Sequence, residues 1–177
     1  ILGRRTIEIM PRSLCSIKSL PSLERRPRTE WEEKGWWGKP PLWRRVHDRA
    51  KNYPNKTAVI DETGKLTYAE LWEESVCSAS VIHNAGLERG QIVLVQLPNW
   101  REFAPIMLGC ELANTIFACC PITWGPRESR RALNLLSPSL WITSDNYLGE
   151  SRTNTIEATC DTTAGALEPV LLRGNGT

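Results

Sequence analysis

The spacing of apolar residues predicts a short helix and then a strand at the start of the regular part of the chain. Leu42, Val46 and Ala50 recur every four residues, which places them on one face of a helix. Pro54 ends this helix, because proline disfavours the α conformation of the residue before it. The β-rich run 57–61 then predicts a strand, and the polar residues after it predict a turn.

A second helix begins with a capping signal. The hydroxyl of Thr67 can accept a hydrogen bond from the backbone N–H of Glu70, while the Glu70 carboxylate accepts one from the N–H of Thr67. Gly86 is a suitable end, because glycine adopts the left-handed conformation without strain. The helix between them carries an apolar or small stripe made of Tyr68, Leu71, Ser75, Ala79 and Ile82.

Three later runs, 91–97, 115–120 and 139–143, are almost entirely apolar and predict strands buried on both faces. Two helical segments separate them. Strands that alternate with helices of ten or more residues are typical of an α/β fold with a mostly parallel sheet flanked by helices.

Each of these two helices has its own boundary signals. For the first, Asn99 is the expected cap, with Glu102 three residues later, and Asn114 suits the left-handed position at its end. The second spans 126–136, with Pro126 in its first turn. Local chemistry thus predicts where the first helix begins and ends and where the second begins.

The segments outside this core, 1–30 and 146–177, show no sustained periodicity, so we expect three parts: a disordered basic leader (1–30), the ordered unit (31–145) and an irregular tail (146–177). Only 169–172 in the tail resembles a strand. The tryptophan-rich lead-in 31–40 would pack on the ordered unit or mark a partner site.

Charge is concentrated in the leader. Its seven basic and three acidic residues give a net charge of +4, which leaves −2 for the rest of a chain whose total is +2. The ordered unit therefore lacks the clustered cations that nucleic acid requires, and we expect no nucleic-acid partner for it. From Met10 onward the leader is rich in arginine and serine, so a mitochondrial transit peptide is the alternative to a cytoplasmic location.

The cysteines form no zinc-binding pattern. None of the six is in a Cys-x-x-Cys pair, and the chain has only two histidines. We expect reduced thiols in an intracellular protein, with Cys119 and Cys120 buried as small apolar residues. The apolar stretch 103–125 contains Glu111 and two prolines, so we expect a buried helix and strand there and no transmembrane segment.

No residue of the sequence is assigned a catalytic role. The sequence has no Gly-x-Ser-x-Gly elbow. His47 and His83 are expected at helix surfaces, and Glu111 on the polar face of its helix. The small-residue segment 162–165 (TTAG) has no lysine and follows no clear strand, so we interpret it as tail and not as a phosphate loop. No lysine occurs after Lys65.

The order of motifs nevertheless resembles the N-terminal portion of the adenylate-forming (AMP-binding) enzymes, which include acyl-CoA synthetases and aryl-AMP ligases. The resemblance covers roughly 31–145. It rests on LTYAEL at 66–71, on QLPNWREF at 96–103 with the glycines just before it, and on the blocks 112–122, 126–128 and 140–143.

This resemblance implies a function for the intact enzyme. ATP and a carboxylic acid would give an acyl-adenylate, and the acyl group would pass to CoA, with Mg²⁺ as the metal. The phosphate loop with its lysine, the acidic residues that handle magnesium and ribose, and the small C-terminal domain have no counterparts in these 177 residues. The resemblance therefore transfers no catalytic, cofactor-binding or metal-binding residue, and we expect no bound cofactor for this chain.

We therefore expect an inactive fragment of an AMP-forming acyl-CoA synthetase that supplies scaffold and part of the acyl-pocket wall. Two alternatives stay open. One is a non-catalytic protein that binds a full-length paralogue through an exposed sheet edge. The other is a protein whose basic leader binds membranes or nucleic acid.

Overall fold

The computed structural model describes residues 28–35, 40–160 and 169–172. The helices in these ranges are α1 (Arg28–Glu33), α2 (Leu42–Asn52), α3 (Tyr68–Asn84), α4 (Phe103–Leu112), α5 (Pro126–Leu136) and α6 (Thr153–Cys160). The strands are β1 (Thr57–Asp61), β2 (Gly64–Thr67), β3 (Ile92–Gln96), β4 (Ile116–Cys119), β5 (Leu140–Ser144), β6 (Asn146–Tyr147), β7 (Glu150–Ser151) and β8 (Val170–Leu172).

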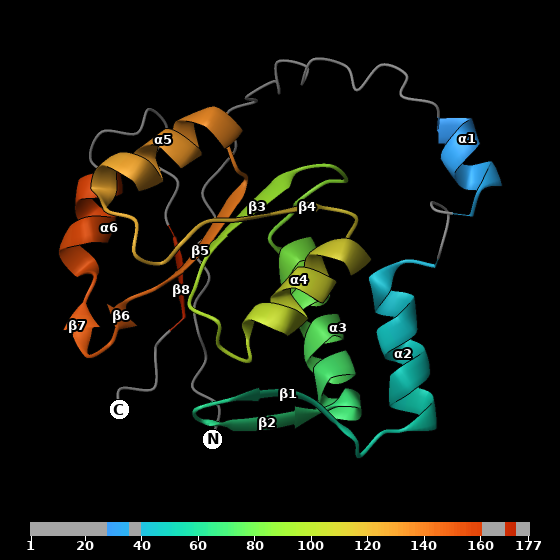
Figure 1. The fold of residues 1–177 in the computed structure, drawn as a ribbon. Helices are drawn as coiled ribbons and strands as arrows, with labels where there is room; N and C mark the ends of the chain where they lie inside the picture. Colours follow the sequence, from blue (N-terminus) through green and yellow to red (C-terminus); the bar gives the residue numbers. More distant parts are fainter. Residues whose placement is uncertain (1–27, 36–39, 161–168, 173–177) are drawn as a thin grey trace.

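Four strands form one parallel sheet in the order β4-β3-β5-β8 (Figure 1). Val93 pairs with Phe117 on one side and with Leu140 on the other, so β3 is an interior strand. Every residue of β3 and of β5 is buried. The expectation of an α/β fold with three adjacent parallel strands is confirmed.

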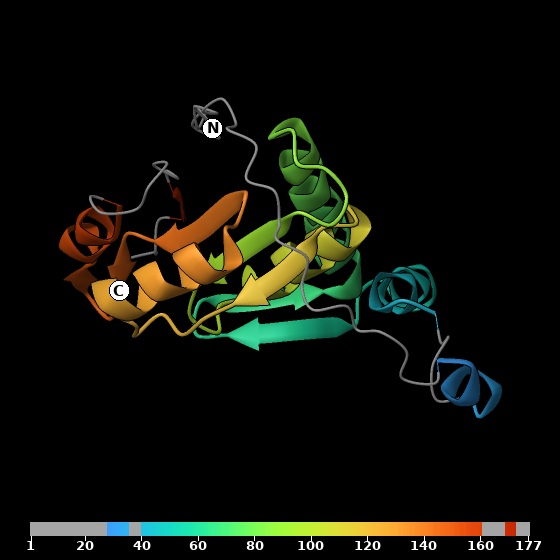
Figure 2. The same cartoon turned by 90° about the horizontal axis from the view of Figure 1, so that it is seen from above.

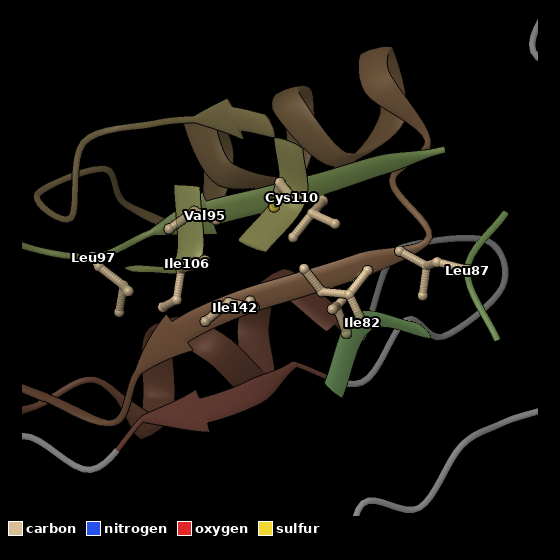
Figure 3. Packing of buried hydrophobic residues seen from close by; sticks show 9 residues of the cluster. Ile82, Leu87, Val95, Leu97, Ile106, Cys110 and Ile142 are labelled. Atoms are coloured by element: carbon tan, nitrogen blue, oxygen red, sulfur yellow. The ribbon is translucent and has the colours of Figure 1, made fainter. Parts of the chain in front are cut away.

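Helices cover both faces of this sheet (Figures 1 and 2). On one face, α3 and α4 contribute Ile82, Ile106 and Cys110 to an apolar cluster with β3 and β5, whose labelled members point toward one another in Figure 3. On the other face, α5 and α6 cover Leu94 and Trp141. The alternation of side chains along a strand produces this division.

The capping signals of the sequence are confirmed where they involve a single helix. Thr67 and Glu70 make the full capping box at the start of α3. Gly86 follows that helix at φ 71°, and Asn114 follows α4 at φ 55°. The helix α5 has the predicted bounds, with Pro126 in its first turn.

The prediction that Asn99 caps α4 is wrong. This helix begins at Phe103, and its cap position is Glu102, without a side-chain capping hydrogen bond. The residues before it are used otherwise, since the N–H of Arg101 donates to the Asp61 carboxylate over 2.9 Å. Asp61 ends β1, which pairs with β2 as an antiparallel hairpin, so a contact to a hairpin forty residues away replaces the local cap.

Two further expectations are corrected. The strand β4 is not buried on both faces: Ile116 and Cys119 are exposed, because β4 is an edge strand of the described sheet. The segment after Asp145 is not wholly irregular, since it contains the short pair β6 and β7, the helix α6 and the strand β8. The strand-like run at 169–172 does pair with β5.

Candidate functional site

The most polar part of the core lies at the carboxyl ends of β3 and β5. Gln96 is the last residue of β3 and the one polar residue in that strand. Its amide nitrogen donates to the Ser129 hydroxyl of α5 over 3.0 Å and to the Pro121 carbonyl over 3.2 Å. The side chain therefore ties the sheet to α5 and to the loop that precedes it.

Arg152 completes this group from the start of α6. Its Nη1 donates to the Thr143 hydroxyl over 2.8 Å, and to the Ser144 carbonyl over 3.4 Å. The Thr143 hydroxyl in turn donates to the carbonyl of Gln96 over 3.1 Å. We refer to Gln96, Ser129, Thr143 and Arg152 as the carboxyl-edge cluster.

The electrostatics of the cluster are dominated by one buried cation. Arg152 is only 7% exposed, and this burial lowers its pKa from the usual value. Burial also raises the pKa of the neighbouring Cys120 thiol to about 11, so the thiol stays neutral and does not neutralise the guanidinium. The cluster thus carries a positive charge in a poorly solvated place.

Four buried polar atoms of this half of the molecule have no hydrogen-bond partner in the part of the chain that the structure describes. They are Gln96 Oε1, Arg130 Nε, Trp141 Nε1 and Arg152 Nη2. Native proteins rarely leave such atoms unpaired, because each loses its hydration without compensation. Three of the four are donors, which suits an acceptor-rich group.

A groove of about 400 Å³ lies between the edge strand β4 and the helix α5, and no residue of the carboxyl-edge cluster lines it. Its walls are mostly apolar, with Glu128 and Arg131 as the charged exceptions. The remaining lining residues are Leu94, Cys119, Cys120, Trp124, Ala132, Leu135 and Leu136.

The three titratable residues considered in the sequence analysis, His47, His83 and Glu111, have different surroundings in the structure. His47 is half-buried and packs on the Trp72 ring, with a centroid distance of 4.7 Å, and His83 is exposed. The Glu111 carboxylate accepts from the N–H groups of Leu42 and Trp43 over 3.1 and 3.0 Å. Glu111, on α4, therefore caps the N-terminus of α2. The sequence indicated only a position on the polar face of its own helix.

The cysteines only partly match expectation. The described cysteines are free thiols, of which Cys110 and Cys120 are buried, whereas Cys77 and Cys119 are exposed. The expectation that both members of the 119–120 pair are buried is wrong for Cys119, because β4 lies at the sheet edge.

Some expectations lie outside the described residues. These include most of the leader 1–30, the tryptophans at 36 and 37, and the TTAG segment 162–165. Among the described residues, no helix is both long and apolar enough to cross a bilayer. No group of three potential metal ligands occurs in that same part of the chain. The assignment of no catalytic, cofactor or metal residue stays a prediction.

The sequence reasoning missed Arg152 and its cluster. Arg152 lies in a stretch without periodicity, and nothing local links it to Thr143. A usable signal did exist, because Gln96 and Thr143 are polar residues at the ends of otherwise apolar strands. Such positions often face a ligand in α/β sheets.

Fold and cluster together define a class: an α/β domain with a parallel sheet whose polar groups gather at the carboxyl ends of the strands. The profile of the AMP-binding enzyme family matches residues 46–173. The chain belongs to this family.

Individual relatives agree with this placement. A salicylyl-CoA synthase / salicylate adenylyltransferase of Streptomyces is 32% identical over 114 residues, which cover 64% of this chain and 20% of the relative. The medium-chain fatty-acid–CoA ligase of Escherichia coli is 31% identical over 120 residues, covering 67% of this chain and 21% of the ligase. The chain therefore spans about a fifth of the length of these curated relatives.

Solved structures show the same fold. The inhibitor-bound N-terminal domain of FACL13 from Mycobacterium tuberculosis superposes with a TM-score of 0.64 at 17% identity, over 76% of this chain and 33% of that one. The sheet and its helices thus have the fold found in that N-terminal domain.

Proposed function

We propose that this chain is part of an AMP-forming acid–CoA or aryl-acid ligase, in which it supplies structural support for a carboxylic acid substrate site. The intact enzyme would join the acid to AMP, using ATP and Mg²⁺, and then transfer the acyl group to CoA. The observation that carries this proposal is the family match across 46–173 on a sheet with strand order β4-β3-β5-β8. The relatives named for salicylate and for medium-chain fatty acids indicate a carboxylic acid as the substrate class.

We further propose that a polypeptide of these 177 residues does not form adenylates. Adenylation requires cations and donors that stabilise the charge developing around the phosphates in the transition state. The sequence has no lysine after Lys65, and the buried guanidinium of Arg152 is already partly used by Thr143 and Ser144. We therefore expect too few cations around the phosphates of ATP for adenylation.

Carboxylate-dependent ATP–pyrophosphate exchange tests the second proposal. The purified chain is assayed with Mg²⁺ and either salicylate or octanoate, beside the Escherichia coli medium-chain ligase as positive control. We expect exchange no faster than in the blank without acid. A cooperative urea transition of the same sample shows that the protein is folded, and exchange that requires the acid contradicts the proposal.

A chimera tests the scaffold role separately. Residues 42–144 replace the matching segment of the Escherichia coli ligase, and exchange is measured with octanoate. If this segment only supports the site, the folded chimera keeps measurable exchange. A chimera that folds and has no exchange contradicts the scaffold role but leaves the inactivity of the chain alone intact.

The edge strand β4 favours a second candidate function, namely a non-catalytic protein that binds a full-length relative. Ile116 is 43% exposed on this strand, and an open edge offers backbone N–H and C=O groups for pairing. Co-purification with a full-length ligase would support this role. Ile116→Lys should then weaken the complex, while Val76→Lys, a change at an equally exposed position on α3, should not.

A further inference from the structure

The guanidinium of Arg152 is only half used by the protein. A guanidinium has five N–H donors. Nη1 donates to Thr143 and Ser144, whereas Nη2 is buried and has no acceptor among the described residues. The side chain is more than nine-tenths buried, so this donor has little contact with bulk water.

Its charge also has no ion-pair partner in the described part of the chain. The ion pairs of the described residues involve Lys34, His47 and Arg101, and none includes Arg152. An isolated buried cation is costly, and buried charges in proteins are normally paired. The neighbouring thiol of Cys120 offers no counter-charge, because burial raises its pKa to about 11.

The location of the guanidinium is typical of a ligand site. Thr143 and Ser144 are the last two residues of β5, and ligands of open α/β sheets bind at the carboxyl ends of the strands. Arg152 immediately precedes α6, whose N-terminus adds partial positive charge at the same place. The strand end is thus a common place for a ligand, and the helix start favours an anion there.

We propose that Arg152 binds an oxyanion, a carboxylate or a phosphate, through Nη2, which no described residue accepts from, while Thr143 and Ser144 hold the other side of the guanidinium. Gln96 Oε1, which also has no partner among the residues with a described position, is an acceptor and repels an anion, so it limits the anion to the Arg152 end of the cluster. Such a site would bind an oxyanion whether or not the chain takes part in adenylation. A negative binding result would therefore leave the proposed function untouched.

Calorimetric titration of the full chain with inorganic phosphate and with acetate, in chloride of matched ionic strength, tests the site. We expect saturable binding of at least one oxyanion in the wild type and a loss of about tenfold or more in Arg152→Gln. Arg127→Gln is the matched control, since it removes an exposed arginine from α5. Tighter phosphate binding indicates a phosphorylated ligand, and tighter acetate binding indicates a carboxylate.

Two results would overturn the site: no saturable binding to the wild type, or equal binding to a folded Arg152→Gln variant. If that variant does not fold, the site is tested in the wild type by NMR of its arginine guanidinium groups. The Arg152 signal is identified as the one that is absent from the spectrum of Arg152→Lys. The Arg152 signal should move with the oxyanion while that of Arg127 stays fixed. An Arg152 signal that does not move at saturating phosphate and acetate overturns the proposal.

Discussion

The two faces of the main sheet are packed by different kinds of contact. Toward α3 and α4, the strands present Val93, Val95 and Ile142 to an apolar cluster. Toward α5 and α6, they present Leu94 and Trp141 beside a polar group that includes a buried cation. The first face is explained by burial of apolar surface alone. The second retains polar atoms that weaken the core unless something binds them.

The apolar face should respond most strongly to the loss of a core side chain. Ile82→Ala removes a fully buried side chain of α3, and we expect a loss of about 2–5 kcal/mol in the free energy of unfolding. Val81→Ala, at the exposed neighbouring position, should change it by less than about 0.5 kcal/mol. Urea unfolding of both variants measures the difference, and equal effects would contradict the packing of this face.

The next largest loss of stability is expected where α3 and α4 approach closely. A Cβ atom added at Gly109 would lie 2.5 Å from the Cβ of Ser78 and 2.9 Å from the backbone nitrogen of Ala79. Gly109→Ala should therefore destabilise the fold by about 1–3 kcal/mol, although alanine itself favours a helix.

Gly125→Ala is the control for this change. Its added Cβ meets only the end of Glu128, at 3.4 Å, so this change lacks the overlap and costs only the poorer cap that alanine makes, about 1 kcal/mol at most. Thermal unfolding should thus separate the two variants clearly. A Gly109→Ala protein as stable as the wild type would show that the helices are further apart.

The attachment of α2 depends on one carboxylate. Glu111→Ala removes the acceptor for the N–H groups of Leu42 and Trp43, and we expect a loss of about 1 kcal/mol. Hydrogen exchange should accelerate in α2 and not in α5. Glu73→Ala on the exposed side of α3 should leave both helices unchanged.

Acid should weaken the hairpin contact of Asp61. Hydrogen bonds from Arg101 and Thr63 lower the pKa of this carboxyl below its usual value in the folded protein. A lowered folded pKa means that the contribution is present above the unfolded value and is lost as pH falls through the folded one. The stability advantage of the wild type over Asp61→Asn should therefore shrink below about pH 4.

A pH series of urea unfolding measures this smallest effect. Glu62→Gln is the control, because this neighbouring side chain is exposed in the same turn. The difference in the free energy of unfolding between Glu62→Gln and the wild type should not shrink below about pH 4 as it does for Asp61→Asn. A constant gap between the wild type and Asp61→Asn from pH 7 to pH 2 would contradict the assigned hydrogen bonds.

Local chemistry predicted much of the fold. The Thr67–Glu70 capping box, the bounds of α5 and the central strand β3 all follow from residues close together in sequence. The exposure of β4 was not predictable, because an apolar strand has the same sequence pattern at the edge and in the centre of a sheet. The helix α6 is short and rich in threonine, so its propensity is weak.

The site was less predictable than the fold for a related reason. Arg152 becomes notable only once it is buried against Thr143, which is nine residues away and in another element. That its Nη2 has no acceptor in the described ranges follows from three-dimensional packing and leaves no periodic pattern in the sequence. Likewise, Glu111 acts on residues 68 and 69 positions away, beyond any local pattern.

Hydrogen exchange of the full chain, compared between phosphate and chloride at matched ionic strength, tests directly whether the two faces have different roles. Our account predicts slower exchange in phosphate at the start of α6 and at the carboxyl end of β5, with α3 and α4 unchanged. Identical exchange in the two salts, or protection confined to α3 and α4, would contradict it.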